Sequence, residues 1–169
     1  MWVAGGVALL IYILTTPKNI VLANSNIEID YQKEHKEFYD ECISCHTLYP
    51  PFLLPKASWV KMMDNLEDHF GDDASLEDDV KESIKAYLVE NAAETSTKES
   101  AYKGLKSIGD KDIIAYTDSE FWKKRHEEID KEIFKAKNIK SKANCKACHL
   151  NIEKGIIEDE NIKIPKQEN

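Results

Sequence analysis

Residues 42–46 read CISCH and residues 145–149 read CKACH, so the chain carries two copies of the pattern C-x-x-C-H. The chain has four cysteines, and all four lie in these two copies. Positions three apart on a helical turn share one face, so two thiols at this spacing can reach the two vinyl groups of one porphyrin. The histidine that follows then points its imidazole at the iron as the proximal ligand. The pattern therefore predicts a fold formed around two covalently attached haem c groups, bound by Cys42, Cys45, His46, Cys145, Cys148 and His149.

Other chemistries also use paired cysteines, and each fits this chain less well. A zinc site made from two C-x-x-C pairs uses all four thiols together, whereas these pairs lie far apart in the chain and each carries an adjacent histidine. Redox disulfides of the thioredoxin type are typical of a βαβ context, and no such pattern is visible here. Structural disulfides between the two copies are a further alternative. We therefore favour covalent haem over zinc and over disulfides.

The hydrophobic pattern predicts an all-α protein. Helical periodicity covers residues 30–45, 59–70, 75–93, 117–137 and 143–154, and no strand of any length is convincing. The first C-x-x-C-H copy therefore ends a helix, and the second copy lies on one.

The same pattern divides the chain into domains. Residues 95–112 are rich in Ser, Lys and Gly and have weak periodicity, so we interpret them as a connector. The connector separates a first haem domain, residues 24–94, from a second haem domain, residues 113–169. Residues 1–23 form a separate N-terminal segment.

Residues 1–23 are predicted to direct the chain out of the cytoplasm. Residues 2–14 read WVAGGVALLIYIL, which is short for a membrane span of about 20 apolar residues. Val21 and Ala23 are small enough for the −3 and −1 positions of a signal-peptidase site, so we favour an export signal cleaved before Asn24. A retained membrane anchor is the alternative. Either way the haem domains are expected in the periplasm, soluble after cleavage or tethered to the inner membrane.

The charge of the chain indicates the kind of partner it meets. The formal net charge is −8 at pH 7, which argues against a nucleic-acid partner because little would neutralise phosphate. Ionised haem propionates add further negative charge. We therefore expect a redox partner with a basic docking face, and an encounter that weakens as salt screens the charges.

Individual residues predict where helices begin and end. Ser58 is the expected N-cap of the helix that starts at Trp59, and Gly71 is expected to end that helix in a left-handed conformation. Residues 117–120 read TDSE, which has the form of a capping box. Residues 49–55 hold three prolines, which favour an extended apolar loop suited to packing against a haem.

Two further histidines are candidate distal ligands. His69 follows His46 by 23 residues, and His126 precedes His149 by 23 residues. Both candidates fall on apolar faces of predicted helices that also carry a tryptophan, and two irons need ligands. Spacing alone leaves open which histidine serves which haem, and a crossed arrangement is an alternative.

The remaining candidates for axial ligation are weaker. His35 sits among Lys and Glu, and we interpret it as a surface residue. Met62 or Met63 could supply a thioether ligand, but methionines on an apolar helical stripe are more often part of the core.

Two imidazoles at each iron predict electron transfer rather than catalysis. A six-coordinate iron has no free position for a substrate, and imidazole pairs leave the potential lower than methionine ligation does. We therefore predict a carrier of single electrons that is not an enzyme. The alternatives are an electron-transfer subunit anchored in a membrane redox complex, a small dihaem peroxidase or nitrite-type reductase with one open iron, and a haem-based gas or redox sensor.

The chain resembles the small dihaem cytochromes c, a family called DHC. The resemblance covers most of the chain after the export segment, and its main stretches are CISCHTLYPPFLLPKASW (42–59), HFGDDASL (69–76), YLVENAA (87–93), FWKKRH (121–126) and ANCKACH (143–149). The proline-rich part of the first stretch is far more specific than C-x-x-C-H alone.

The resemblance implies a fold, a ligand set and partners. The implied fold is an N-terminal half similar to class I cytochromes c and a smaller helical C-terminal half that binds the second haem. The implied ligation is bis-histidine, with His69 and His126 in the distal positions. The implied role is periplasmic electron transfer to a small oxygen-binding monohaem cytochrome, often alongside a membrane b-type cytochrome.

Overall fold

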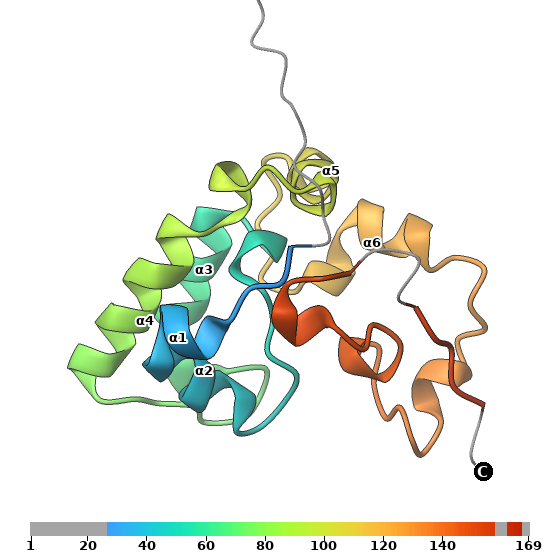
Figure 1. Ribbon diagram of the computed structural model, residues 1–169, viewed down its shortest axis with the longest axis horizontal. Helices are drawn as coiled ribbons and strands as arrows, with labels where there is room; N and C mark the ends of the chain where they lie inside the picture. The colour runs from blue at the N-terminus through green and yellow to red at the C-terminus, as the bar shows by residue number, and fades with distance from the viewer. Residues whose placement is uncertain (1–26, 158–161, 167–169) are drawn as a thin grey trace, which may run out of the picture.

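The regular structure of this protein is helical. The computed structural model describes residues 27–157 and 162–166 (Figure 1). Across those residues it contains α-helices, short 3₁₀ turns and two isolated β-bridges, and no strand. The predicted all-α fold is therefore confirmed.

The predicted export signal or anchor, residues 1–23, lies outside the described residues. Within the described ranges, no helix combines the length and the apolar character that a membrane crossing requires. The division of the chain into two haem domains around residues 95–112 stays a prediction.

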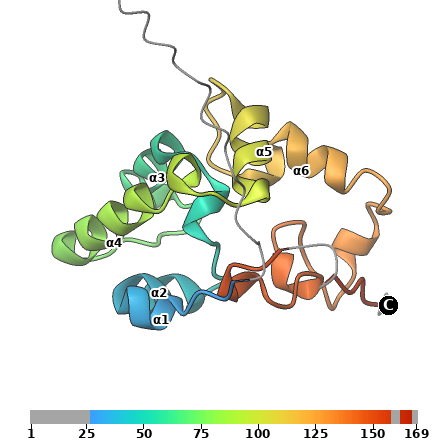
Figure 2. The same cartoon turned by 45° about the horizontal axis from the view of Figure 1, so that its top comes forward.

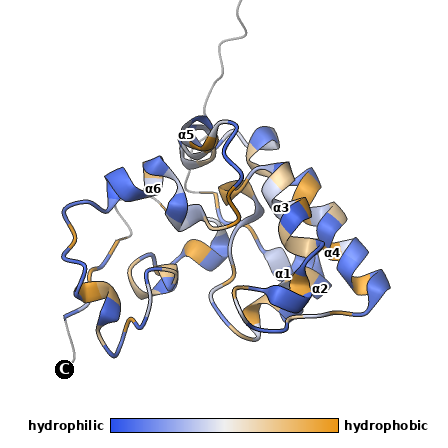
Figure 3. Ribbon diagram, turned by 180° about the vertical axis from the view of Figure 1, so that it is seen from behind, coloured by the Kyte–Doolittle hydropathy of each residue, from blue (hydrophilic) through white to orange (hydrophobic). Residues whose placement is uncertain are grey.

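From residue 27 to the end of the first half, the chain forms four α-helices: α1 (Tyr31–Glu34), α2 (Lys36–Ile43), α3 (Lys56–Met63) and α4 (Asp78–Glu90). α3 lies alongside α4 (Figure 2), and α2 also packs against α4. Apolar and polar residues alternate along α3 and α4, as expected of helices with one buried face (Figure 3). The main core is formed by Tyr31, Phe38, Leu48, Leu54, Trp59, Met63, Leu66, Ile84, Leu88, Ala92 and Ile108.

The helix predicted over residues 30–45 is broken at His35. His35 has an extended backbone, with φ −154° and ψ 95°, so it ends α1 and starts α2. Its Nδ1 accepts a hydrogen bond from the Phe38 N–H at 3.1 Å, so the imidazole satisfies a donor that a helix start would leave without a partner. α2 ends at Ile43, so the first C-x-x-C-H copy does terminate a helix, as predicted.

α3 starts and ends earlier than the predicted helix over residues 59–70. It begins directly after Pro55, because the fixed φ of proline suits a helix start. Ser58, the predicted N-cap, is buried inside the helix instead. The helix ends at Met63, and a 3₁₀ turn, η2 (Leu66–Asp68), follows.

His69 therefore lies in a turn and not on a helical stripe, so the sequence prediction was wrong on this point. The Ala74 N–H donates to the Leu66 carbonyl at 2.9 Å, which folds the chain back and closes the turn. Gly71 has the predicted left-handed conformation, with φ +95°, but it serves this turn and not the end of a helix.

In the second half of the molecule, the residues that the structure describes form two α-helices, α5 (Glu99–Ile108) and α6 (Glu120–Arg125). α5 forms inside the predicted connector and packs against α6. Its buried face consists of Ala101, Gly104 and Ile108, which recur at helical spacing, so interpreting residues 95–112 as a connector overlooked a helix whose pattern the sequence does contain. Gly104 is needed there because a Cβ would lie 3.0 Å from Cε2 of Tyr116.

Regular helix is shorter in this half than predicted. α6 ends at Arg125, far short of Lys137, and its N-cap is Ser119 and not Thr117, because the Ser119 hydroxyl accepts from the Trp122 N–H at 3.1 Å. Outside the α-helices and η2, the chain forms 3₁₀ turns: η1 (Pro51–Leu53), η3 (Ala93–Thr95), η4 (Tyr116–Asp118), η5 (Ile133–Lys135), η6 (Cys145–Ala147) and η7 (Ile152–Lys154). The last two replace the helix predicted over residues 143–154.

The two halves are hydrogen-bonded to each other beside the two C-x-x-C-H copies. The Thr47 hydroxyl donates to the Asn144 side-chain carbonyl at 3.3 Å, and the Tyr49 hydroxyl donates to the Ala143 carbonyl. The proline-rich segment 49–55, predicted to be extended, forms η1 within this junction. A second, smaller core crosses the junction and consists of Phe52, Leu53, Ala93, Ala101 and Ile152.

Candidate functional site

The first candidate site begins at the end of α2. Cys42 is half-buried in the last turn of the helix, and Cys45 is exposed just beyond it. The Nδ1–H of His46 donates to the Thr47 carbonyl at 2.7 Å, since a carbonyl can only accept. In the neutral ring this hydrogen bond selects the tautomer whose other nitrogen, Nε2, has a lone pair available to a metal.

His69 faces His46 across a gap. The two ring centroids are 6.0 Å apart, and the ring planes differ by 15°. A metal lies about 2 Å from an imidazole nitrogen and about 3 Å from the ring centre, so two imidazoles on opposite sides of one metal have centroids about 6 Å apart. The separation of His46 and His69 fits two ligands of one metal ion.

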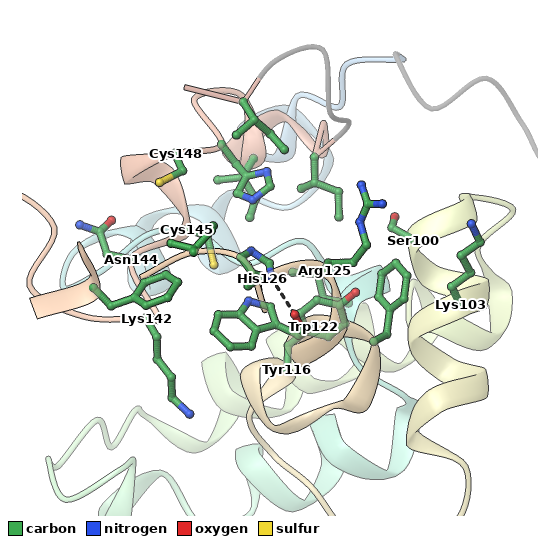
Figure 4. Close-up of a pocket in the computed structure, with 18 of the residues that line it drawn as sticks. Ser100, Lys103, Tyr116, Trp122, Arg125, His126, Lys142, Asn144, Cys145 and Cys148 are labelled. Carbon is green, nitrogen blue, oxygen red and sulfur yellow. Dashed lines mark hydrogen bonds between the residues drawn. The ribbon is translucent and has the colours of Figure 1, made fainter. Parts of the chain in front are cut away.

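A second pair of histidines has the same separation. The centroids of His126 and His149 are 6.0 Å apart, with ring planes at 57°. The His126 Nδ1–H donates to the Trp122 carbonyl at 2.7 Å, and its ring stacks on the Trp122 indole at a centroid distance of 4.3 Å. This hydrogen bond is drawn in Figure 4, where His126 shares a cavity with Cys145 and Cys148. The uncrossed pairing, His46 with His69 and His126 with His149, is the one that the geometry favours.

The cavity beside the second pair suits a porphyrin. It has a volume of about 270 Å³, and both cysteines and both histidines of the second site line it. Lys103, Arg125 and Lys142 lie around the same cavity (Figure 4), and Lys103 and Lys142 form ion pairs with Glu99 and Asp118. Apolar walls with a few convergent polar groups are typical of a cofactor site. The apolar walls include Leu53, Tyr116, Phe121, Trp122, Phe134, Ile139, Ile152 and Ile157.

The charge states of the candidate ligands agree with metal binding. Burial lowers the pKa of His69 below the usual histidine value, and the neighbouring His46 lowers it further. Burial also lowers the pKa of His126, against the opposing effect of its hydrogen bond to the Trp122 carbonyl. Both imidazoles are therefore neutral at pH 7, which is the form that binds a metal.

Burial favours the neutral form of three of the four thiols. Burial raises the pKa of the Cys42 thiol to about 12 and that of Cys145 to about 11, and it also raises the pKa of Cys148. Zinc binding and thiol–disulfide exchange both use the thiolate. All four cysteines are free. In the described part of the chain, no three or more His, Cys, Asp or Glu side chains gather in a group that could hold a metal ion.

The weaker ligand candidates have structural roles. His35 is half-buried rather than on the open surface: it caps α2, its Nε2 lies 3.2 Å from the Ser83 hydroxyl, and its ring lies 4.7 Å from that of Tyr87. Met63 belongs to the main core and Met62 packs against it, as expected of methionines on an apolar stripe.

Several residues around the sites have no signal in the sequence that would have identified them. Trp122 supplies both the carbonyl and the ring that hold His126, and only its position four residues before that histidine hints at this role. The Thr47 carbonyl, which accepts from His46, and the ring of Phe70, which contacts His69, likewise have no signal in the sequence. Backbone acceptors and loop neighbours depend on tertiary structure, which periodicity does not report.

Residues 38–157 match the family model described as dihaem cytochrome c. A diheme cytochrome c from Shewanella baltica OS155, sb-DHC, is 34% identical over 76% of this chain and 91% of its own, with a TM-score of 0.62. A diheme cytochrome c from Rhodobacter sphaeroides is 32% identical over 77% and 99%, with a TM-score of 0.65. A structure of DHC purified from Rhodobacter sphaeroides is 32% identical over 72% and 96%, with a TM-score of 0.57. No curated protein matches the chain by sequence.

Proposed function

Since the chain belongs to the dihaem cytochrome c family, we propose that it carries single electrons between redox proteins, through two irons that each bind two imidazoles. Membership of the family implies two covalently attached c-type haems and electron transfer as their chemistry. The observation that carries the finer proposal is the 6.0 Å separation of the facing imidazoles, His46 with His69 and His149 with His126.

The residues of the chain hold and orient the groups that carry the electron. The haems supply a reversible one-electron couple, and the four cysteines attach them through sulfur. The carbonyls of Thr47 and Trp122 keep the Nδ1 protons of His46 and His126, so that Nε2 of each ring is directed to a metal. Ligands held in one orientation by hydrogen bonds and ring contacts move little when an electron arrives, and this favours rapid transfer.

Two imidazole ligands at each iron would also distinguish the proposed electron carrier from the enzyme and sensor alternatives. A dihaem peroxidase, a nitrite-type reductase and a gas sensor each need one iron with an open or exchangeable position. Two facing imidazoles at both sites support a carrier over these alternatives.

The distribution of charge supports a basic partner for the first haem domain. Residues 24–94 contain 17 Asp and Glu but 6 Lys and Arg, whereas residues 113–169 contain 11 and 12. The negative charge of the chain therefore resides almost entirely on the first domain. We propose that a small oxygen-binding monohaem cytochrome, a membrane b-type cytochrome or both exchange electrons with this protein, and that the partner of the first domain presents basic residues.

The proposed compartment is the periplasm. Covalent haem attachment to C-x-x-C-H takes place outside the cytoplasm, and residues 1–23 have the pattern of an export signal or anchor. Release from cells by osmotic shock would support a cleaved signal, whereas retention with inner-membrane vesicles would support a tether.

Low-temperature electron spin resonance of the oxidised holoprotein tests the ligation directly. We expect low-spin ferric signals that account for both irons, because each carries two strong-field imidazoles. A stoichiometric high-spin signal would contradict the proposal and favour an enzyme or a sensor. Fewer than two irons per chain would contradict the assignment of two haems.

A further inference from the structure

Phe70 follows His69 in a turn whose backbone does not suit a bulky side chain. The His69 N–H donates to the Asp72 carbonyl at 2.8 Å, and the Asp72 N–H donates back to the His69 carbonyl at 3.3 Å. Phe70 and Gly71, between them, have φ values of +58° and +95°. Positive φ at both central residues is the signature of a type I′ turn, which favours Asn followed by Gly. Phenylalanine in the first central position is therefore strained.

Packing within the protein's apolar cores does not account for this strain, because Phe70 belongs to neither core. A strained residue that contributes little to the core points to a local role. The ring contact of Phe70 indicates which role: its centroid lies 5.1 Å from that of His69, with the planes at 77° in an edge-on arrangement.

His69 lacks the anchors that hold the other distal histidine. His126 has both a hydrogen bond to the Trp122 carbonyl and a stacked indole. The ring of His69 has no hydrogen bond to another residue in the described part of the chain, and its ring contacts are with His46 and Phe70. The turn fixes the backbone of His69, through Asp72 and through the Phe70 N–H that donates to the Asp68 carbonyl at 3.1 Å. Backbone hydrogen bonds do not fix the rotation of the ring, so a side-chain contact is required for that.

We propose that Phe70 is a positioning residue that sets the plane of the His69 imidazole nearly parallel to that of His46. The inference rests on the proposed function, in which these two rings bind one iron. The 15° angle of the first pair is the arrangement that Phe70 maintains, and the 57° angle of His126 and His149 is set separately by Trp122.

The angle between two axial imidazoles has a spectroscopic signature. In low-spin ferric haem, parallel imidazole planes split the two iron d orbitals that overlap with the ligands and give a rhombic spin-resonance spectrum. Crossed planes bring these orbitals closer in energy and raise the largest g value. The wild-type holoprotein is therefore expected to show two distinct low-spin signals, a rhombic one from the first site and one with a larger maximal g from the second.

Substitutions at Phe70 test the assignment in the holoprotein. Phe70→Asn suits the type I′ turn and removes the ring, and Phe70→Leu keeps the strain and removes the ring. Both are expected to broaden the rhombic signal or move its maximal g upward, while the second signal stays unchanged. Phe70→Tyr retains an aromatic ring and should retain the wild-type spectrum. Tyr102→Asn, at another exposed aromatic residue, is the matched control and should leave both signals unaltered.

The outcomes separate this inference from the proposed function. Two low-spin signals in the wild type, with the rhombic one unchanged in both Phe70→Asn and Phe70→Leu, would overturn the role of Phe70 and leave bis-imidazole ligation intact. A high-spin signal in the wild type would overturn the proposed ligation itself. If Phe70→Asn raises the thermal stability and also alters the rhombic signal, the strained backbone of Phe70 is retained in order to orient the His69 imidazole.

Discussion

The imidazoles in the two facing pairs are held in place by different neighbouring residues. His46 and His126 each donate Nδ1–H to a backbone carbonyl, and His126 also stacks on Trp122. A hydrogen bond of this kind makes an imidazole a stronger electron donor and fixes its orientation. His69 depends instead on the ring of Phe70. The potential of each haem is therefore expected to respond to changes at one or two residues of its own site.

Replacing one distal histidine with methionine should move one potential. A thioether ligand raises the haem potential relative to imidazole. We therefore expect His69→Met to raise the potential of the first haem, and His126→Met that of the second haem. The expected rise is on the order of 0.1 V, within the range of roughly 0.8 V that axial ligands span. The other site should stay nearly unchanged. Redox titration followed by absorbance would resolve the two waves. If neither wave moves in either variant, His69 and His126 are not ligands.

At the level of elements, α2 places the first cysteine of the first site, and the start of α2 depends on His35. The imidazole caps the helix by accepting from the Phe38 N–H. His35→Ala should destabilise the folded holoprotein by about 1 kcal/mol, the typical cost of a lost N-cap. His35→Asn should recover much of this, because asparagine is a strong N-cap. Denaturant unfolding measures the difference. Equal losses in both variants would show that the contact with Tyr87 matters more than the cap.

The elements also show how far the sequence alone could lead. Both C-x-x-C-H copies and the helical class follow from spacing and periodicity, and spacing also singles out His69 and His126, although it leaves their pairing open and periodicity misplaced His69 on a helix. The ends of helices do not, because they depend on local acceptors: the His35 ring breaks the first helix, and the Ser119 hydroxyl starts α6 at a different residue from the predicted one. His69 lies in a turn because local backbone hydrogen bonds close it, between His69 and Asp72 and from Ala74 to Leu66, and an apolar stripe cannot reveal such bonds.

In the second half, long helices were predicted where the structure has short turns. Trp122, His126, Ile129 and Ile133 recur at helical spacing and share the face of one predicted helix, but in the structure α6 ends at Arg125 and Ile129 lines the cavity from outside any helix. A small domain that surrounds a large apolar cofactor needs fewer helix–helix contacts than its hydrophobic pattern indicates. α5 is the opposite case: its buried residues Ala101, Gly104 and Ile108 recur at helical spacing, but the Ser, Lys and Gly content of residues 95–112 led to their interpretation as a connector.

Across the whole molecule, negative charge is concentrated in residues 24–94, the predicted domain of the first site. The excess of acidic residues in residues 24–94 contrasts with the near balance in residues 113–169. Glu67 and Glu77 are exposed and lie on either side of the His69 turn in the sequence. A basic redox partner should therefore be attracted to the first domain before it makes close contact.

Two double variants that each remove two negative charges test whether a basic partner is attracted to the first domain. The double variant Glu67→Gln/Glu77→Gln and its control Glu127→Gln/Glu128→Gln each remove two exposed carboxylates, from the first and the second domain respectively. With a basic monohaem cytochrome c as the probe, stopped-flow electron transfer at low salt should slow severalfold in the first variant and much less in the control. At high ionic strength the rates should converge, because salt screens exposed charges beyond about 10 Å at 0.1 M. Equal slowing in both variants, or rates indifferent to salt, would rule out steering towards the first domain.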